Sequence, residues 1–355
     1  MNDAGPEAST QQPRAGRRFS WRRALGVIAA LVVVVAVFAN FLPRIADYTD
    51  VLDVVRELST LQLLLLAVVG VINIVTFPPP WMAALPGLSF RQGLVLTQTS
   101  TALSSAVPGG DAVGIGVSFA MLRQWRFDSQ AVTTAVVLTG LWNQLINVCL
   151  PLVALALLTL GGEDQPLLRS AGLIGVVVLL VVVVGIVAVM RGEGSTRRLG
   201  ERAQQAAGWA LRLARREPAA GWGAAFVHFR RETINVLARR WAWLTLASLA
   251  GHLSVFAVLI ACLRVCDVTS AEVNWIEALA AWGLVRLLTA VPITPGGLGV
   301  VELGLTGALI GFGGHDAEVV AAVLLYRAIT YLPPIVLGAL FGLTWRRHRL
   351  ADAAT

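Results

Sequence analysis

The chain has 355 residues, of which 56% are hydrophobic and only 14% are charged, and its formal net charge is +7. Soluble domains carry about 25% charged residues, so this composition excludes an ordinary soluble protein, and its apolar content excludes a disordered one. Together with a mean hydropathy of +0.73, it predicts an all-α polytopic membrane protein, in which helices satisfy the backbone hydrogen bonds within the bilayer.

The positive charge comes from arginine alone, because all 28 residues in the Lys+Arg count are arginine. A chain without lysine has no P-loop lysine and no Schiff-base lysine. The arginines stand at the ends of apolar segments, as the positive-inside rule places them, so we expect no binding of nucleic acid. No CxxC, GxSxG or HExxH pattern occurs, and we expect no metal, no cofactor and no enzymatic activity.

The chain begins with residues 1–22, which we expect to form a disordered basic cytoplasmic tail. The apolar run from Ala24 to Leu42 would span about 28 Å as a helix, and it lacks the short core and cleavage site of a signal peptide. We therefore expect an uncleaved first span, followed by a short interfacial helix at 43–58. Further complete spans are expected at residues 60–77, 131–160, 167–190, 241–263 and 319–345.

Residues 191–240 are rich in arginine and interrupt the apolar pattern. Apolar side chains such as Trp209 and Phe226 recur there at helical spacing, which predicts basic amphipathic helices on the inner leaflet. An ordinary basic cytoplasmic loop is the alternative. We assign this segment as an insert in a transmembrane domain at 23–346, and residues 347–355 as a cytoplasmic tail.

Two apolar segments are interrupted by Pro-Gly-Gly. Residues 92–122 break at 108–110, and residues 275–311 break at 295–297. If every arginine cluster is cytoplasmic, both termini are cytoplasmic, the first broken segment enters from the cytoplasm and the second enters from outside. This pattern predicts an inverted repeat with discontinuous helices. The arm after each break would reach only about 17–21 Å, which favours re-entrant hairpins that meet near the midplane over kinked complete spans.

The backbone after each break is a candidate binding site for an anionic headgroup. A helix that starts there presents unpaired N–H groups and positive partial charge, and glycine lets a ligand approach the backbone. The alternative is that the glycines only permit close packing of helices. The candidate residues at the two breaks are Pro108, Gly109, Gly110, Asp111, Pro295, Gly296, Gly297 and Gly299.

Ionisable residues within apolar segments are costly and are functional candidates. Glu302 lies in the second broken segment, Arg286 in the arm before its break and Arg327 in the last span. Either arginine is a candidate to neutralise Glu302 or to bind a phosphate, and a purely structural ion pair with Arg286 is the alternative. Asp111 begins a predicted helix and is a candidate cap. His252 is expected to make a satisfied polar contact. Hydrogen bonds between helices are expected from Asn143, Gln144 and Asn147.

The stretch from Pro292 to Glu302, which reads Pro-Ile-Thr-Pro-Gly-Gly-Leu-Gly-Val-Val-Glu, resembles the signature of the lysylphosphatidylglycerol synthase transmembrane family, also called the flippase-like family. The pair Tyr326-Arg327 resembles a later motif of that family, and the likeness covers roughly residues 22–347. The resemblance implies a multi-span protein of the bacterial inner membrane that is associated with moving lipids between leaflets. It also implies that Tyr326 belongs to the substrate-binding residues.

The first break departs from the family pattern. Many relatives have Gly-Glu there with an arginine after it, whereas this chain has Gly110-Asp111 and no arginine before Arg123. No soluble aminoacyl-transferase domain follows in this sequence, so we do not expect synthase activity.

The leading hypothesis is therefore a translocase for an anionic phospholipid or a lipid-linked glycan, working by alternating access in the bacterial plasma membrane. It predicts that Glu302, Arg286 and Arg327 face one cavity, and that transport is passive or coupled to an ion, with Glu302 or Asp111 carrying a proton. The expected partners are anionic membrane lipids and a lipid-modifying enzyme. The alternatives are a transporter of small anions and a non-catalytic membrane partner of such an enzyme.

Overall fold

The computed structural model describes residues 53–106, 110–160, 222–289 and 294–344, together with isolated positions between 177 and 205. Several predicted features lie outside the described residues. These are the two terminal tails, the span at Ala24–Leu42, most of the span at 167–190, residues 206–221 of the insert, Pro108 and Gly109.

Every regular element of the described residues is helical, which confirms the all-α prediction. The elements are α3 (Thr60–Val75), α4 (Pro78–Ala84), α5 (Phe90–Ser105), α6 (Asp111–Gln124), α7 (Ser129–Leu160), α10 (Trp222–Val265), α11 (Trp275–Leu288), the 3₁₀ turn η3 (Pro295–Gly297), α12 (Val300–Gly311) and α13 (Asp316–Thr344).

Capping residues in the sequence decide where several helices begin. Ser59 precedes α3 and Ser89 precedes α5, and each forms a capping box with a glutamine three residues later. Asn274 caps α11 in the same way, together with Glu277. In each box two backbone N–H groups that have no partner within the helix gain a side-chain acceptor. The local sequence therefore sets these helix starts before any tertiary contact forms.

The helix α3 ends at Val75, close to the predicted end of the span at residue 77, and the three prolines that follow begin a new helix. Pro78, Pro79 and Pro80 form the first turn of α4, where a helix needs no N–H donor. The helical path consequently continues to Ala84, seven residues beyond the predicted end at residue 77. Phe77, at the junction, is the N-cap of α4.

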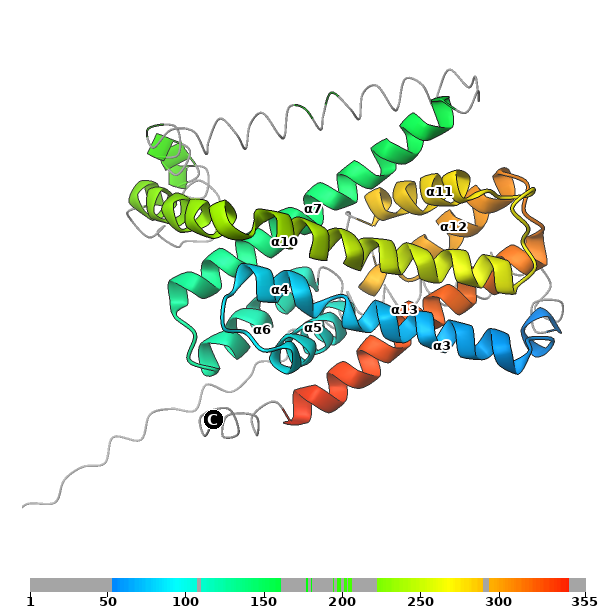
Figure 1. Ribbon diagram of the computed structural model, residues 1–355, viewed down its shortest axis with the longest axis horizontal. Helices are drawn as coiled ribbons and strands as arrows, with labels where there is room; N and C mark the ends of the chain where they lie inside the picture. The colour runs from blue at the N-terminus through cyan, green and yellow to red at the C-terminus, as the bar shows by residue number, and fades with distance from the viewer. Residues whose placement is uncertain are drawn as a thin grey trace, which may run out of the picture.

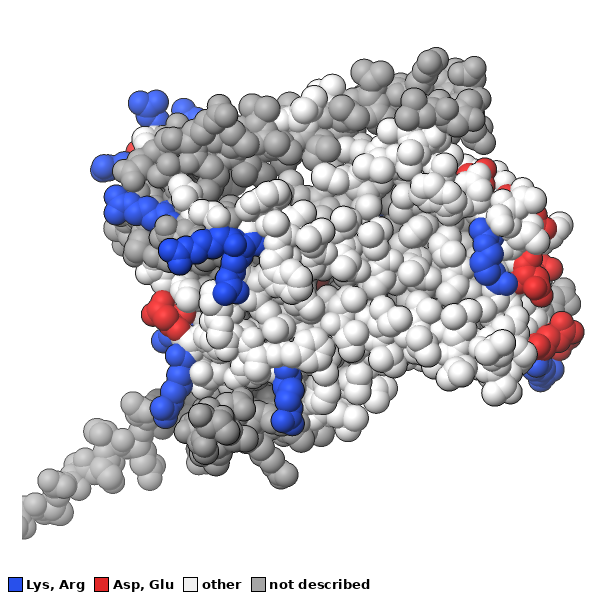
Figure 2. Space-filling model, in the orientation of Figure 1, with Lys and Arg blue, Asp and Glu red and all other residues white. Residues whose placement is uncertain are grey.

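Four helical stretches of the described residues are long and apolar enough to cross a membrane: Thr60–Ala84, Ser129–Leu158, Ala238–Val265 and Asp316–Gly342. In Figure 2, most arginine side chains lie at one end of the long axis, most acidic side chains lie at the other end, and the face between them is uncharged. A bilayer core excludes isolated charges from such a band. The protein is therefore a multi-pass membrane protein.

The predicted span at 241–263 agrees with the apolar stretch Ala238–Val265. This stretch is part of one continuous helix, α10, which covers residues 222–265, so the last part of the basic insert and the span form a single helix. Its 44 residues reach about 66 Å, roughly twice the thickness of a bilayer core. The apolar part from Ala238 suffices to cross the membrane, so the basic N-terminal part extends the same helix beyond it.

Each broken segment forms a pair of short helices that pack against each other, α5 with α6 and α11 with α12. These helices have 16, 14, 14 and 12 residues, so none reaches the roughly 30 Å of a bilayer core. Two long helices contact both hairpins: α7 packs on α6 and α11, and α13 packs on α5 and α12 (Figure 1). The predicted hairpins are thus present, and their inverted-repeat relationship stays a prediction.

The last span approaches the first hairpin closely at Gly338 of α13. A Cβ atom there would overlap the carbonyl oxygen of Gln98 on α5. We expect Gly338→Ala to lower the free energy of unfolding by ~1–3 kcal/mol, the usual range for overpacking. At Gly342, one turn later, the nearest atom is Thr99 Cγ2 at 3.7 Å, an ordinary contact. Gly342→Ala is therefore expected to be neutral or slightly stabilising. Thermal unfolding of both variants in detergent tests this, and equal midpoints would contradict it.

Candidate functional site

A cavity of about 410 Å³ lies where the two hairpins meet α7 and α13. This volume is within the range of about 300–1,000 Å³ that is usual for small-molecule sites. Its wall combines residues that are far apart in the sequence: α5 and α6 contribute one side, α11 and the second break another, and α7 and α13 complete it. The breaks predicted from two separate Pro-Gly-Gly motifs therefore share one site.

Seven of the predicted site residues line this cavity: Gly110, Asp111, Arg286, Gly296, Gly297, Tyr326 and Arg327. Pro295 is in the turn η3 beside it, and Gly299 is the N-cap of α12. Asp111 is in the first turn of α6, whose N-cap is Gly110, and it forms no side-chain cap, so its predicted capping role is wrong. Glu302 does not line the cavity, since its side chain is only 2% exposed. Direct contact between Glu302 and a substrate stays a prediction.

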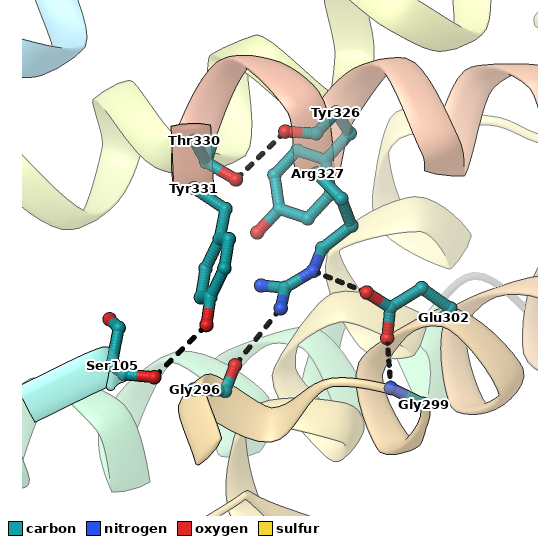
Figure 3. A network of polar contacts seen from close by, with 8 residues as sticks. All are labelled: Ser105, Gly296, Gly299, Glu302, Tyr326, Arg327, Thr330 and Tyr331. Atoms are coloured by element: carbon teal, nitrogen blue, oxygen red, sulfur yellow. Dashed lines mark hydrogen bonds and ion pairs between the residues drawn. The ribbon is translucent and has the colours of Figure 1, made fainter. Parts of the chain in front are cut away.

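Glu302 pairs with Arg327 rather than with Arg286. Arg327 Nε donates to Glu302 Oε1 at 2.8 Å, and Arg327 Nη2 donates to the Gly296 carbonyl at 2.9 Å. The other oxygen of Glu302 accepts the Gly299 N–H at 2.7 Å. Figure 3 shows Arg327 reaching from α13 toward Glu302 and Gly296 on the second broken segment. The carboxylate thus neutralises Arg327 and holds the loop after the break to the last span.

The backbone of the second break requires glycine. Gly296 and Gly299 have φ angles of +57° and +83°, which residues with a side chain rarely adopt. A Cβ atom at Gly296 would also overlap the ring of Tyr331, whose hydroxyl donates to the Ser105 carbonyl at 3.1 Å on the first hairpin. Gly296 therefore permits close packing, as the alternative explanation requires, and it also lines the cavity. Its role in binding a headgroup stays a prediction.

Arg286 has a different environment from Arg327. Its Nε donates to Asn147 Oδ1 on α7 at 2.9 Å, and its guanidinium lies 4.8 Å from the centre of the Trp282 ring. Trp282 is buried and donates from Nε1 to Tyr326 OH at 3.0 Å. Among the described residues no carboxylate lies within ion-pair distance of Arg286. The guanidinium of Arg286 therefore lines the cavity beside the Trp282 ring and has no carboxylate partner among the described residues.

Of the three polar side chains of α7 for which hydrogen bonds between helices were predicted, Asn147 forms them. Asn147 Oδ1 accepts from Arg286, and Asn147 Nδ2 donates to Gln144 Oε1 at 3.2 Å. The Nε2 atom of His252 on α10 lies 3.2 Å from the same Asn147 oxygen, and its Nδ1 atom lies 2.8 Å from the Ser248 carbonyl. These contacts connect α7, α10 and α11, and they confirm both the hydrogen bonding between helices expected of Asn147 and the polar contact expected of His252.

Several residues of the site were not predicted. Thr294 is 5% exposed and lines the cavity, and its hydroxyl oxygen has no hydrogen-bond partner among the described residues. The two aromatic rings behind the arginines were also missed, although a sequence signal existed. Trp282 precedes Arg286 by four residues and Tyr331 follows Arg327 by four, the spacing that places side chains together on one helix face. The remaining polar wall is formed by Ser104, Ser105, Asn143, Gln144 and Thr289.

This arrangement suits the binding of an anion. An arginine without a carboxylate partner attracts negative charge, and its planar fork matches the oxygen atoms of phosphate. Hydroxyl and amide groups around it supply further hydrogen bonds, and the unpartnered Thr294 hydroxyl is available to donate to a ligand. No group of three or more His, Cys, Asp or Glu side chains within the described part of the chain is placed to hold a metal ion.

A comparison with known protein families matches residues 22–338 to the family model described as the lysylphosphatidylglycerol synthase TM region. No curated protein matches the chain. The matched range includes all the described helices except the last residues of α13, and it contains both broken segments and every residue that lines the cavity. The chain therefore belongs to the family of lysylphosphatidylglycerol synthase transmembrane regions.

Proposed function

We propose that the protein is a translocase that moves an anionic phospholipid or a lipid-linked glycan between the leaflets of a bacterial plasma membrane. The observation that carries this proposal is that both broken segments and two arginines from different helices face one cavity. In transporters with broken helices, substrate sites occur where such breaks meet near the midplane of the bilayer. Membership of a lipid-related membrane family supports the same substrate class.

The cavity has the size and chemistry of a headgroup site. Its polar wall and the unneutralised Arg286 favour a phosphate-containing group, and its volume of about 410 Å³ suits a headgroup rather than a whole lipid. The acyl chains need no enclosed site, because the surrounding hydrocarbon solvates them as well as protein side chains do. A substrate would thus cross with its headgroup in the cavity and its chains in the bilayer. No bond is made or broken in this process, so we propose no catalytic residue.

The charge distribution supports a topology with both termini in the cytoplasm. Arg91, Arg123 and Arg126 flank the ends of α5 and α6, and Arg239 and Arg240 lie on α10 where it leaves its apolar part. The opposite end carries mostly acidic side chains (Figure 2). Positively charged connections of membrane proteins are usually cytoplasmic, so this distribution supports the proposal that the arginine-rich end faces the cytoplasm.

Leaflet exchange in liposomes tests the proposal. The full chain is reconstituted with fluorescent phosphatidylglycerol, and dithionite reduction reports how fast the inner-leaflet lipid becomes accessible. Val148 lines the cavity and Val153, on the same helix, is exposed on its surface. We expect Val148→Trp to slow exchange by roughly tenfold or more, which corresponds to ~1.4 kcal/mol on the barrier, and Val153→Trp to leave it unchanged.

Three results would redirect the proposal. If the wild type exchanges lipid no faster than empty liposomes, phosphatidylglycerol is not the substrate, and a lipid-linked glycan is tested in the same assay. The polar wall of the cavity also fits a small soluble anion, so uptake of such an anion without lipid exchange would favour an anion transporter. If neither moves, a role as the membrane partner of a lipid-modifying enzyme is favoured, and its test is co-purification of an enzyme that acts on lipids.

A further inference from the structure

The hydrogen bonds around His252 cannot all be satisfied while this residue is neutral. The Nδ1 atom faces the Ser248 carbonyl oxygen at 2.8 Å, and the Nε2 atom faces Asn147 Oδ1 at 3.2 Å. Both of these oxygens accept hydrogen bonds. A neutral imidazole has only one N–H group, so one of its nitrogen atoms presents a lone pair to an acceptor. The side chain is 8% exposed, and water has little access to relieve this contact.

Reversing the amide of Asn147 does not remove the conflict. Arg286 Nε donates to Asn147 Oδ1 at 2.9 Å. If the amide were turned so that Nδ2 faced His252, the same Nδ2 group would face the N–H of Arg286, and two donors would meet. The amide orientation in which Oδ1 accepts from Arg286 is therefore the better one. In that orientation only the imidazolium form of His252 donates to both of its neighbours.

The charge of Arg286 opposes the imidazolium form. Both cations would share the Asn147 oxygen in a buried environment, where the repulsion between like charges is strong. The carboxylates on the other helices that pack on α10 lie at helix ends: Glu277 lies in the first turn of α11, and Asp316 and Glu318 lie in the first turn of α13. None of the three forms an ion pair with Arg286 or His252 among the described residues. α3 and α4 contain no titratable side chain, and α7 contains only Cys149. On α13, the cavity-facing cation Arg327 is already neutralised by Glu302.

An anion bound beside Arg286 would change this balance. Its negative charge would offset the repulsion between the guanidinium and the imidazolium, and the second hydrogen bond of His252 would then stabilise the charged form. We infer that His252 takes up a proton from water when an anionic group binds beside Arg286, so that the cavity binds its anion together with one proton. The inference rests on the proposed anion-binding function of the cavity. It assigns the proton to His252 instead of to Glu302 or Asp111.

The linkage must act in both directions, because a coupling free energy between two sites is reciprocal. Protonated His252 strengthens anion binding, and protonation is favoured as the pH falls. Affinity is therefore expected to rise from pH 8 toward pH 5, by at most about tenfold per pH unit, the limit for one linked proton. A flux of anionic lipid would then carry protons with it, and a pH gradient across the membrane could drive the movement of lipid.

Isothermal titration calorimetry tests the inference on the full-length protein in detergent. Two probes carry the same phosphodiester, short-chain phosphatidylglycerol and its deacylated form, glycerophosphoglycerol, and neither phosphodiester titrates between pH 5 and pH 8. Titrations in buffers with different ionisation enthalpies give the number of protons taken up on binding. The wild type is expected to take up between zero and one proton, with the uptake depending on pH.

The matched variants are His252→Gln and His315→Gln. Glutamine at 252 can donate an N–H to Asn147 without gaining charge, so its binding is expected to be independent of pH and to take up no proton. His315 lies on the loop between α12 and α13, where it is 73% exposed and contacts Glu272. His315→Gln should therefore bind the anion with the same pH dependence and the same proton uptake as the wild type. If His252→Gln fails to fold, the proton count of the wild type alone decides, and no proton uptake at any pH overturns the inference.

The outcomes separate this inference from the proposed function. Proton uptake that depends on His252, without exchange of phosphatidylglycerol in liposomes, would support the inference and contradict translocation of phosphatidylglycerol. Lipid exchange with binding that is independent of pH would contradict the inference alone. Proton uptake on binding of glycerophosphoglycerol, with an affinity equal to that of the lipid, would support the inference for a soluble phosphodiester. Failure of both probes to bind would overturn the inference and would contradict phosphatidylglycerol as the substrate.

Discussion

Glu302→Gln is expected to lower the free energy of unfolding by ~3–5 kcal/mol, the usual loss when one member of a buried ion pair is removed. The reason is that Arg327 would keep its charge while losing the carboxylate 2.8 Å away, although its side chain is only 13% exposed. The loop after the second break would lose its ionic link to α13 as well. Chemical or thermal unfolding in detergent measures the effect.

The chain offers a matched control at Glu277. This residue occupies the same third position of its helix, α11, and accepts the N–H of Asn274 at 2.7 Å, as Glu302 accepts that of Gly299. Glu277 has no arginine partner among the described residues. Glu277→Gln should therefore cost much less than Glu302→Gln. Equal losses in the two variants would mean that the ion pair contributes nothing beyond the helix cap.

A double variant separates the ion pair from other effects. If the loss in Glu302→Gln comes from the stranded charge of Arg327, then Glu302→Gln combined with Arg327→Gln should be less destabilised than the sum of the two single variants, by ~0.5–3 kcal/mol. Glu302→Gln should also leave a second unneutralised arginine at the cavity. Its affinity for an anion is consequently expected to increase while its stability decreases.

Arg286→Gln is expected to weaken the binding of phosphatidylglycerol by ~10–150-fold, which corresponds to the ~1.5–3 kcal/mol of a hydrogen bond to a charged group. The rate of leaflet exchange should fall with it. The variant should still fold, because within the described part of the chain the Arg286 side chain forms one hydrogen bond, from Nε to Asn147. Arg286→Lys keeps the charge without the planar fork, and it should recover part of the affinity.

Arg123→Gln is the control for this prediction. Arg123 is an exposed arginine in the last turn of α6, and it donates to the Phe127 carbonyl outside the cavity. It carries the same charge but is not expected to touch a substrate. Unchanged affinity in Arg286→Gln, or the same loss in Arg123→Gln, would show that the cavity does not bind the anion through Arg286.

Much of the fold could be predicted from the sequence because its signals are local. The length of an apolar segment predicts a membrane span. Pro-Gly-Gly predicts a break in a helix, since proline lacks the backbone N–H donor and glycine permits a positive φ angle. What the local pattern did not predict is how the chain continues beside two of the spans. The prolines at 78–80 begin a further helix, α4, and the basic residues before Ala238 belong to the same helix, α10, as the span.

The choice of partners within the site could not be predicted in this way. Sequence spacing leaves both arginines as candidates for Glu302, which is 16 residues after Arg286 and 25 before Arg327. The structure selects Arg327, because α13 packs against α12 at the level of the carboxylate. Arg286 points instead toward α7, where Asn147 accepts its Nε–H. The same packing leaves Arg286 without a counter-ion and so defines the chemistry of the cavity.

The sequence by itself determined the class of the protein, the family, the two breaks and most of the residues that surround them. The composition of the chain, the lengths of its apolar segments and a short motif indicate these properties, and none of them depends on contacts between distant segments. Only the tertiary structure decided that the breaks share one cavity, that Glu302 is buried behind Arg327, and that His252 meets the Arg286 site through Asn147. These contacts join residues 25 to 139 positions apart, and the helix packing that places them together has no local signal in the sequence.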